Sequence, residues 1–382
     1  MKFFSRFPQG ALSVEETQKT AIIGRADAAL AARPAHITDS VAPNSAGGRH
    51  DFFSQADYAW PNPDTADGLP FVSRDGETYP GAFFDHRKAM RAMRTNVANF
   101  TAAYLFTKDP KYAKAAETWI KEFFLDKETM MNPSLLYSQA VLGVCTGRGI
   151  GIIDTLHLID VPVAADILLE NGQMDKSVYE GLKSWFAAYL NWMCTHQYGI
   201  DEMNWFNNHS VCWHVQAAAF ACFTGNNDVL QMCVDHYKNA ILPGQMADDG
   251  SFPKELTRTK PYGYSIFIVD NMATLCYLLS TETENLWDFT LADGRSVKKG
   301  LDYLYPYLND KTKWPHRTDI AHHEDWPVAM SFMLFAAASY DEDKWLELYS
   351  RLSKYSENYE VRRNTAIRVP YLWLCSVIFH NS

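Results

Sequence analysis

Helical periodicity is the feature that most limits what this chain can fold into. Apolar residues recur three and four positions apart along most of the sequence, and short turns restart the pattern about every twenty residues. No run of residues alternates convincingly between apolar and polar, as a half-buried strand would. The sequence therefore predicts an all-α fold of stacked helical hairpins. Periodicity alone does not distinguish an open solenoid from a closed toroid.

Capping and turn residues set the limits of the predicted helices. Ser13-Val-Glu-Glu16 is a capping box that opens an amphipathic run to about Ala32. Phe106-Thr-Lys-Asp-Pro110 and Phe223-Thr-Gly-Asn-Asn-Asp228 are typical of a turn between two helices. Further helices are predicted at 85–106, 109–124, 134–143, 150–170, 176–196, 208–223, 226–240, 262–280, 294–307, 326–339 and 342–356.

Residues 34–84 are the exception to the helical pattern. They are rich in proline, glycine, aspartate and aromatic residues, as in Tyr58-Ala-Trp60-Pro-Asn-Pro-Asp64. Long non-helical segments in compact domains are usually functional or disordered, and this aromatic content argues against disorder. We expect an ordered loop that lines or covers a cleft. Because no linker divides the chain, residues 1–382 are predicted to form one domain.

Composition excludes several classes of protein. The 382 residues are 47% hydrophobic with a net charge of −10, which suits a large buried core and argues against a nucleic-acid partner. Seven scattered cysteines without a CxxC pair predict no disulfide framework. No apolar stretch is long enough for a membrane helix. The start of the sequence lacks an apolar signal core, so we expect a periplasmic or secreted protein whose signal is absent here, or a cytoplasmic one.

Two polar segments carry the functional signal. Asn207-Asn208-His209 precedes an apolar helical run, and Arg258 and Tyr264 follow about fifty residues later. Amide, imidazole and guanidinium groups can bind and neutralise a sugar carboxylate, and a phenol can transfer a proton beside it. A polysaccharide lyase needs this combination, whereas a glycoside hydrolase needs two acidic groups.

With these residues in view, the chain resembles the alginate lyase superfamily of helical-toroid polysaccharide lyases, which includes mannuronan and glucuronan lyases. The resemblance implies an (α/α) toroid fold. It implies that Asn208, His209 and Arg258 face the substrate and that Tyr264 transfers the proton, with Tyr262 as the alternative. The matching segments, in chain order, are 50–54, 60–64, 132–139, 147–154, 207–209, 250–258 and 323–327.

Other polar and aromatic residues are candidate sugar contacts, each with a structural alternative. Asn207 could cap a helix, Arg148 could pair with Asp154 inside the core, and the tryptophans could be core residues. His322-His323-Glu324-Asp325 lacks metal-ligand spacing and could be a salt-bridged helix start, so no metal or cofactor is predicted. The candidate substrate-binding residues are Asn207, Gln139, Arg148, Trp60, Trp205, Lys260, Tyr262, His323 and Glu324.

The predicted reaction is β-elimination at a 1,4-linked polyuronate, which leaves a 4,5-unsaturated uronate end. One tyrosine can take the C5 proton and protonate O4 only if both lie on one face of the ring, which favours β-D-mannuronate or β-D-glucuronate. We expect an acidic polysaccharide as partner, and a monomer or weak dimer. A non-catalytic polyuronate-binding protein is one alternative. The other is a glycoside hydrolase that draws its acid and base from Asp154, Asp201, Glu202, Asp248, Asp249 and Glu255.

Overall fold

The computed structural model describes residues 16–375 and is mostly helical. The longer helices are α1 Glu16–Leu30, α2 Asp85–Thr107, α3 Pro110–Phe124, α4 Asp160–Glu170, α5 Lys176–Thr195, α7 Asn208–Thr224, α8 Asn227–His236, α11 Pro261–Leu279, α12 Val297–Asn309, α13 Ser331–Tyr340 and α14 Asp343–Arg351. The shorter ones are α6 Gln197–Met203, α9 Leu242–Gln245, α10 Pro253–Leu256, α15 Tyr359–Arg363 and α16 Pro370–Cys375.

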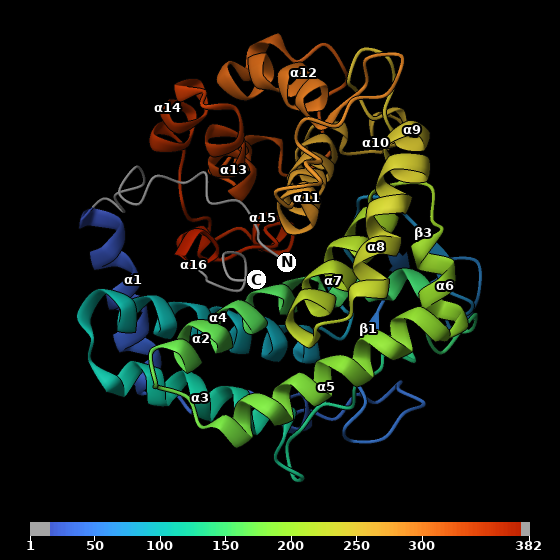
Figure 1. Cartoon of the computed structure of the whole chain (residues 1–382). Coiled ribbons are helices and arrows are strands. Elements are labelled where there is room, and N and C mark those ends of the chain that lie inside the picture. Colours follow the sequence, from blue (N-terminus) through green and yellow to red (C-terminus); the bar gives the residue numbers. More distant parts are fainter. Residues whose placement is uncertain (1–15, 376–382) are drawn as a thin grey trace.

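The helices follow one another around a ring, which makes the fold an all-α toroid. Figure 1 shows α2 to α5 along the lower side, α8 to α10 on the right and α12 to α14 along the top. Neighbouring helices pack in sequence: α2 contacts α3, α7 contacts α5 and α11, and α11 contacts α13. Every residue of α11 is buried, so this helix runs through the core of the ring. Across residues 16–375, none of the helices combines the length and apolar character that a membrane crossing needs.

Local signals explain where the helices nearest the site begin. Asn207 caps α7, because its side-chain oxygen accepts a hydrogen bond from the His209 N–H at 3.2 Å. Helix α11 begins at Pro261, a first-turn position where proline costs little. Asp319 accepts the Tyr262 and Gly263 N–H groups at 2.7 and 2.9 Å, and an added Cβ at Gly263 would lie 3.2 Å from that carboxylate.

One predicted helix is wrong. Residues 134–143 contain strand β4, Tyr137–Ala140, which pairs in parallel with β1, Phe53–Gln55. Gln139 adopts a left-handed backbone with φ of 48°, which a helix does not permit, and its N–H donates to the Ser54 hydroxyl at 2.8 Å. Residues 150–170 also differ, because 3₁₀ turns occupy Gly149–Ile159 before α4 begins. The predicted capping box at Ser13 lies outside the described residues.

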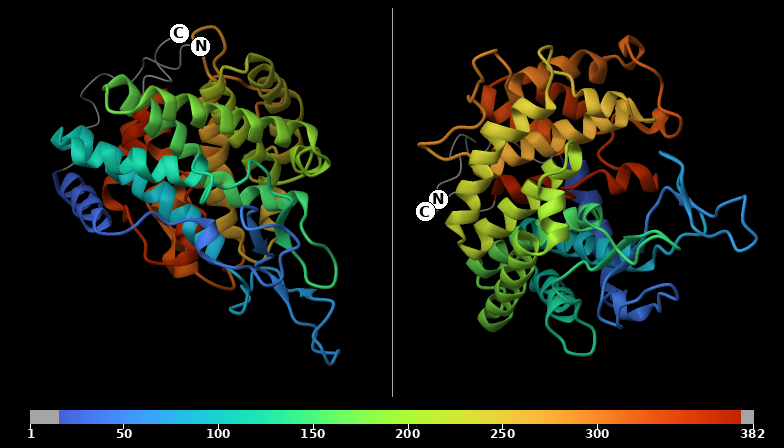
Figure 2. Two further views of the ribbon diagram at one scale, coloured as in Figure 1. Left: turned by 90° about the horizontal axis from the view of Figure 1, so that it is seen from below. Right: turned by 90° about the vertical axis from the view of Figure 1, so that its right-hand side faces the viewer.

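Residues 34–84 form an extended segment against one face of the ring. It contains β1 and a short antiparallel pair, β2 Ala59–Trp60 with β3 Val72–Ser73. In both views of Figure 2 the blue tip of this segment projects from the helical body. Its base is anchored inside the fold, where Ser54 donates to Asp154 at 2.5 Å and Phe53 donates its N–H to His86 at 3.0 Å. The segment therefore forms a wall beside the helices rather than a separate unit.

Candidate active site

A pocket of about 420 Å³ lies where the extended segment meets the starts of α7 and α11. This size is typical of small-molecule sites in proteins. Asn208 and His209 open α7, and Tyr264 lies in the first turns of α11. Segments far apart in the sequence contribute its lining. The polar residues of this lining include Asp57, Tyr58, Asp75, Arg91, Gln139, Arg148, Asp154, His157, Asn208, His209, Arg258, Tyr264, Arg363 and Asn364.

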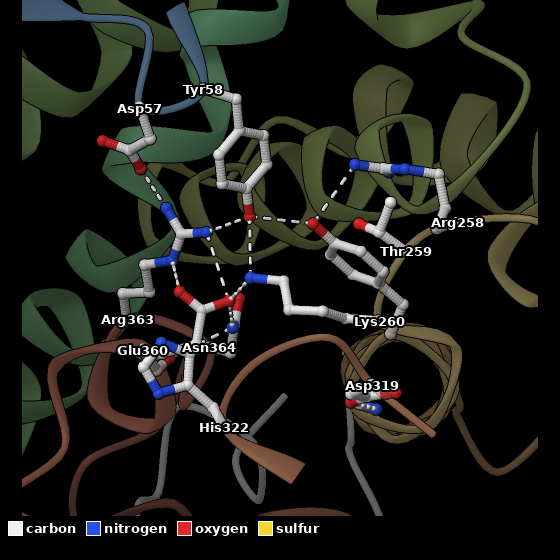
Figure 3. Close-up of polar contacts among 12 residues, drawn as sticks. Asp57, Tyr58, Arg258, Thr259, Lys260, Asp319, His322, Glu360, Arg363 and Asn364 are labelled. Atoms are coloured by element: carbon white, nitrogen blue, oxygen red, sulfur yellow. Dashed lines mark hydrogen bonds and ion pairs between the residues drawn. The ribbon is translucent and has the colours of Figure 1, made fainter. Parts of the chain in front are cut away.

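Two tyrosine hydroxyls form the centre of the polar network. The Tyr58 oxygen receives hydrogen bonds from Lys260 Nζ at 3.0 Å and from the Arg363 guanidinium (Figure 3). Lysine and arginine only donate, so the Tyr58 proton is left for the Tyr264 oxygen, 2.9 Å away. Arg258 Nη2 donates to the same Tyr264 oxygen at 3.1 Å. Because Tyr264 accepts twice, its own proton is free to point into the pocket.

Burial keeps Tyr264 protonated. The loss of hydration raises the pKa of Tyr264 well above its usual value, and the charges of Arg258 and Arg363 offset only part of this rise. The charge of Arg258 reduces the cost of ionising this phenol, but burial is the larger effect. The phenol is therefore neutral near pH 7, with two donors already directed at its oxygen.

Arg258 is held by a carboxylate of the extended segment. Its Nε and Nη2 donate to Asp75 at 3.1 and 2.6 Å, and the guanidinium lies 4.3 Å from the centre of the Tyr264 ring. Hydrogen bonds from Arg258 and Thr259 lower the pKa of Asp75 despite its partial burial. Asp75 thus orients the arginine and presents to it the same chemical group that a uronate would bring.

Two buried glutamates orient the residues at the start of α7. Glu255 accepts hydrogen bonds from the Asn208 backbone N–H at 2.9 Å and from Asn208 Nδ2 at 2.9 and 2.8 Å. Both Glu255 oxygens lie in nearly the same direction from Asn208 Nδ2, so one N–H of this amide donates to both of them. The second N–H of the amide is left free. Glu202 lies 2.8 Å from His209 Nδ1, which directs Nε2 away from it. Burial raises the pKa of both glutamates, and their partners offset part of the rise.

Gln139 and Arg148 also line the pocket. Arg148 Nε donates to the Gln139 carbonyl at 3.0 Å rather than to Asp154. Asp154 instead accepts from Arg87 at 2.9 Å and from Ser54. Gln139 is held in its left-handed conformation by these contacts, a strained geometry that often occurs at functional sites. Both side chains remain candidates for contact with a sugar.

The other predicted contacts lie outside this pocket. Lys260 is buried in an ion pair with Glu360 and supports Tyr58. Tyr262 is fully buried, donates to the Tyr307 carbonyl at 3.0 Å and packs against His323. Geometry thus favours Tyr264 over Tyr262 for the proton transfer.

The other residues predicted to contact sugar have structural roles or lie at the surface. Trp60 donates to the Glu77 carbonyl at 2.8 Å and stacks with Arg74. Trp205 is 37% exposed and stacks on Phe206. Asn207 is the cap of α7. Glu324 pairs with Lys311 at 2.9 Å, the salt-bridged alternative. Within residues 16–375, no cluster of histidine, cysteine or acidic residues could hold a metal ion.

Arg363 and Asn364 are site residues that the sequence did not predict. Arg363 is the last residue of α15 and Asn364 follows it, and the two reach the pocket from the side opposite Arg258 (Figure 3). Arg363 also pairs with Asp57, which faces Arg87 as well. Their local sequence is a charged run of the kind that usually faces solvent, so no local signal could have identified them.

The pocket brings together an amide, an imidazole, a guanidinium and a phenol, and each carboxylate that lines it (Asp57, Asp75 and Asp154) is paired with an arginine. On an all-α toroid, this set defines a polysaccharide lyase rather than a hydrolase. The chain belongs to the alginate lyase family, whose sequence model matches residues 36–314.

Solved structures agree with this assignment. An alginate lyase from Bacteroides ovatus aligns with a TM-score of 0.81 and 29% identity, over 91% of this chain and 92% of its own. Alginate lyase A1-III from Sphingomonas species A1 aligns with a TM-score of 0.53 and 14% identity, over 86% and 88%. A histidine variant of alginate lyase A1-III in complex with a tetrasaccharide aligns with a TM-score of 0.55 and 14% identity, over 88% of this chain and 89% of its own. At 14% identity the likeness concerns the fold alone. No curated protein sequence matched the chain.

Proposed function

We propose that this polyuronate lyase cleaves β-D-mannuronan or β-D-glucuronan by β-elimination, with Tyr264 as both base and acid. The observation that carries the proposal is the Tyr264 hydroxyl, which lines the pocket beside Asn208 and His209 and accepts hydrogen bonds from Arg258 and Tyr58. The polymer class rests on the family and on the relative from Bacteroides ovatus, an alginate lyase. The enzyme is proposed to act as a monomer or weak dimer.

The first step is neutralisation of the uronate carboxylate. The proton on C5 becomes acidic enough to remove only when the charge that develops on the carboxylate is stabilised. The free N–H of Asn208 and the Arg258 guanidinium supply donors around the pocket, and His209 adds an Nε2–H donor when its ring carries both protons. These groups are fixed by Glu255, Glu202 and Asp75, so they need little reorganisation as charge develops.

Tyr264 then transfers the proton. As phenolate it takes the C5 proton, and as phenol it returns a proton to the leaving O4. Its high pKa disfavours the phenolate, but the Tyr58 hydroxyl and Arg258 would stabilise the anion as it forms. One residue can serve both steps only where C5–H and C4–O share a face, as in β-D-mannuronate and β-D-glucuronate. For α-L-guluronate, His209 would have to act from the other side.

A hydrolase has less support from this pocket. It would need one protonated carboxylic acid beside the scissile bond. Arginine neighbours lower the pKa of Asp57 and Asp75, so both stay ionised. Glu202 and Glu255 are engaged with His209 and Asn208, and the side chain of Asp248 is 95% exposed in solvent.

The function is tested by ultraviolet absorbance on mixing the enzyme with mannuronan, guluronan, glucuronan and hyaluronan. A conjugated 4,5-unsaturated uronate absorbs, whereas the reducing end released by a hydrolase does not. We expect the absorbance to rise with mannuronan or glucuronan and to rise much less with guluronan. New reducing ends without absorbance would indicate hydrolysis, and binding without either signal would indicate a non-catalytic protein.

Tyr58→Phe is expected to reduce kcat by about 10–100-fold, because the Tyr264 phenolate loses one of its two donors. Loss of a donor to the anion raises the pKa of Tyr264 further, so the rising limb of the pH–rate profile should move to higher pH. Rates measured across pH for both proteins would show the shift. An unchanged profile would mean that Tyr58 does not act on the proton transfer.

Glu202→Gln is expected to lower kcat by roughly 10–100-fold with a smaller change in KM, because His209 loses the carboxylate that orients its ring. Glu255→Gln provides the matched test at Asn208, whose backbone N–H keeps an oxygen acceptor in the amide. Steady-state kinetics and thermal unfolding should be measured together. A parallel loss of Tm and activity would assign Glu202 to stability alone.

A further inference from the structure

A second pocket, of about 320 Å³, lies on the far side of α15 from the active site. Helix α2 and the segment from Lys354 to Arg368 form it, with Val328 and Ala329 at its edge. No aspartate or glutamate is among the described residues that line it, although the chain as a whole carries a net charge of −10. Its basic lining residues are Lys88, Arg91, Arg94, Lys354, Arg362 and Arg368.

Several of these positive charges have no acidic partner. Within residues 16–375, the Arg91 and Arg368 side chains make no ion pair, and Arg91 Nε is buried without a hydrogen-bond acceptor. Their guanidinium groups instead stack on aromatic rings, Arg91 at 5.0 Å from Tyr359 and Arg368 at 4.6 Å from Tyr355. Arg94 differs, because it bonds Asp160 and His157 inside the core.

Burial and neighbouring positive charge both disfavour the protonated guanidinium of Arg368. Burial, followed by the nearby charges of Arg25 and Arg94, lowers the pKa of Arg368 to about 10. An anion that entered the pocket would relieve this repulsion and supply the missing acceptors. Arg362 is exposed and lies 4.0 Å from Glu357, so it too is available to an anion. The pocket therefore favours a ligand that carries carboxylates or similar groups.

The second pocket adjoins the catalytic one. Arg91 lines both, and α15 separates them, with Arg363 and Asn364 on the active-site side and Tyr359 and Arg362 on the other. Lys88, Arg91 and Arg94 lie three residues apart on α2, which places them along one face of the helix. Arg91 thus lies between the two pockets, and Lys88 and Arg94 flank it at the second one.

We propose that this second pocket is a remote subsite for uronate residues of the same polymer whose scissile bond lies at Tyr264. The identity of the polymer rests on the proposed function. Guanidinium groups of Arg362 and Arg368 would bind carboxylates of successive sugars. The enzyme would then prefer long chains over short ones, because only long chains reach both pockets.

The test is the dependence of kcat/KM on oligouronate length in Arg362→Ala/Arg368→Gln. The shortest cleavable oligomers should be cleaved as by the wild type, whereas kcat/KM on long chains should fall roughly fivefold or more, through KM. The control is Arg33→Ala/Lys313→Ala, which removes the same charge from exposed positions outside both pockets. Equal rates for variant and control at every length would overturn the proposal. Arg362→Ala alone, at an exposed position, provides the test if the double variant unfolds.

Binding separates this inference from the proposed reaction. In Tyr264→Phe protein, the affinity for long oligouronates measured by calorimetry should fall when Arg362 and Arg368 are replaced, and short oligomers should bind equally well. A wild type that binds but cleaves no polyuronate would refute the proposed function and leave the subsite standing. Length-independent binding in the Tyr264→Phe background would refute the subsite whatever the reaction is.

Discussion

Tyr264→Phe should lower kcat by about 10³-fold or more while the affinity for polyuronate stays within roughly twofold. The change removes only the hydroxyl that we propose to take the C5 proton and to protonate O4. The ring remains packed under Arg258, so the shape of the pocket is kept. Initial rates from ultraviolet absorbance and binding by calorimetry, on the same preparation, separate the two effects.

Tyr262→Phe is the matched control for this prediction. Tyr262 lies two residues earlier, and its hydroxyl donates to the Tyr307 carbonyl away from the pocket. We expect near-normal kcat and a loss of about 1 kcal/mol in the free energy of unfolding, the usual contribution of one hydrogen bond. If Tyr262→Phe were inactive and Tyr264→Phe active, the roles of the two tyrosines would have to be exchanged.

Arg258→Ala should reduce kcat by about 10²–10³-fold and raise KM less. The guanidinium donates to the Tyr264 oxygen and faces the pocket, so its charge acts both on the phenolate and on the uronate carboxylate as it gains charge. Interactions that strengthen towards the transition state appear in kcat rather than in KM. Asp75 would lose its main partner, and its pKa would return towards its ordinary value.

Arg258→Lys and Asp75→Asn help to interpret that result. Lysine keeps the charge but not the fork that binds Asp75 through two nitrogens, so we expect partial activity. Asp75→Asn keeps the shape and removes the competing negative charge, so KM should fall if Asp75 occupies the place of a uronate. A pure rise in KM in Arg258→Ala, with kcat unchanged, would show that Arg258 only binds substrate.

The sequence predicted most of the helices because their signals are local. Apolar spacing and caps such as Asn207 and Asp109 act within a few residues. The helix predicted at 134–143 failed because its structure depends on a distant strand, with Gln139 bonded to Ser54. The short helices α6, α10 and α15 contain too few residues to show a periodicity.

The candidate site shows the same difference between residues with a local sequence signal and partners that come from distant segments. Asn208, His209, Arg258 and Tyr264 line one pocket because α7 and α11 pack side by side with their starts at the same end. Their supporting partners came from elsewhere: Asp75 of the extended segment holds Arg258, and Arg363 of α15 bonds Tyr58, which donates to Tyr264. Such pairings join positions hundreds of residues apart, and a single sequence carries no signal for them.

The contact between Tyr58 and Arg363 has a consequence for biosynthesis. These residues are 305 positions apart, so at about 5–20 residues per second the arginine leaves the ribosome roughly 15–60 s after the tyrosine. A nascent chain that has already formed α7 and α11 would still lack Arg363 and Glu360, and with them the positioning of Tyr58. Activity would therefore appear late in synthesis, and proteolysis just before α15 would remove it.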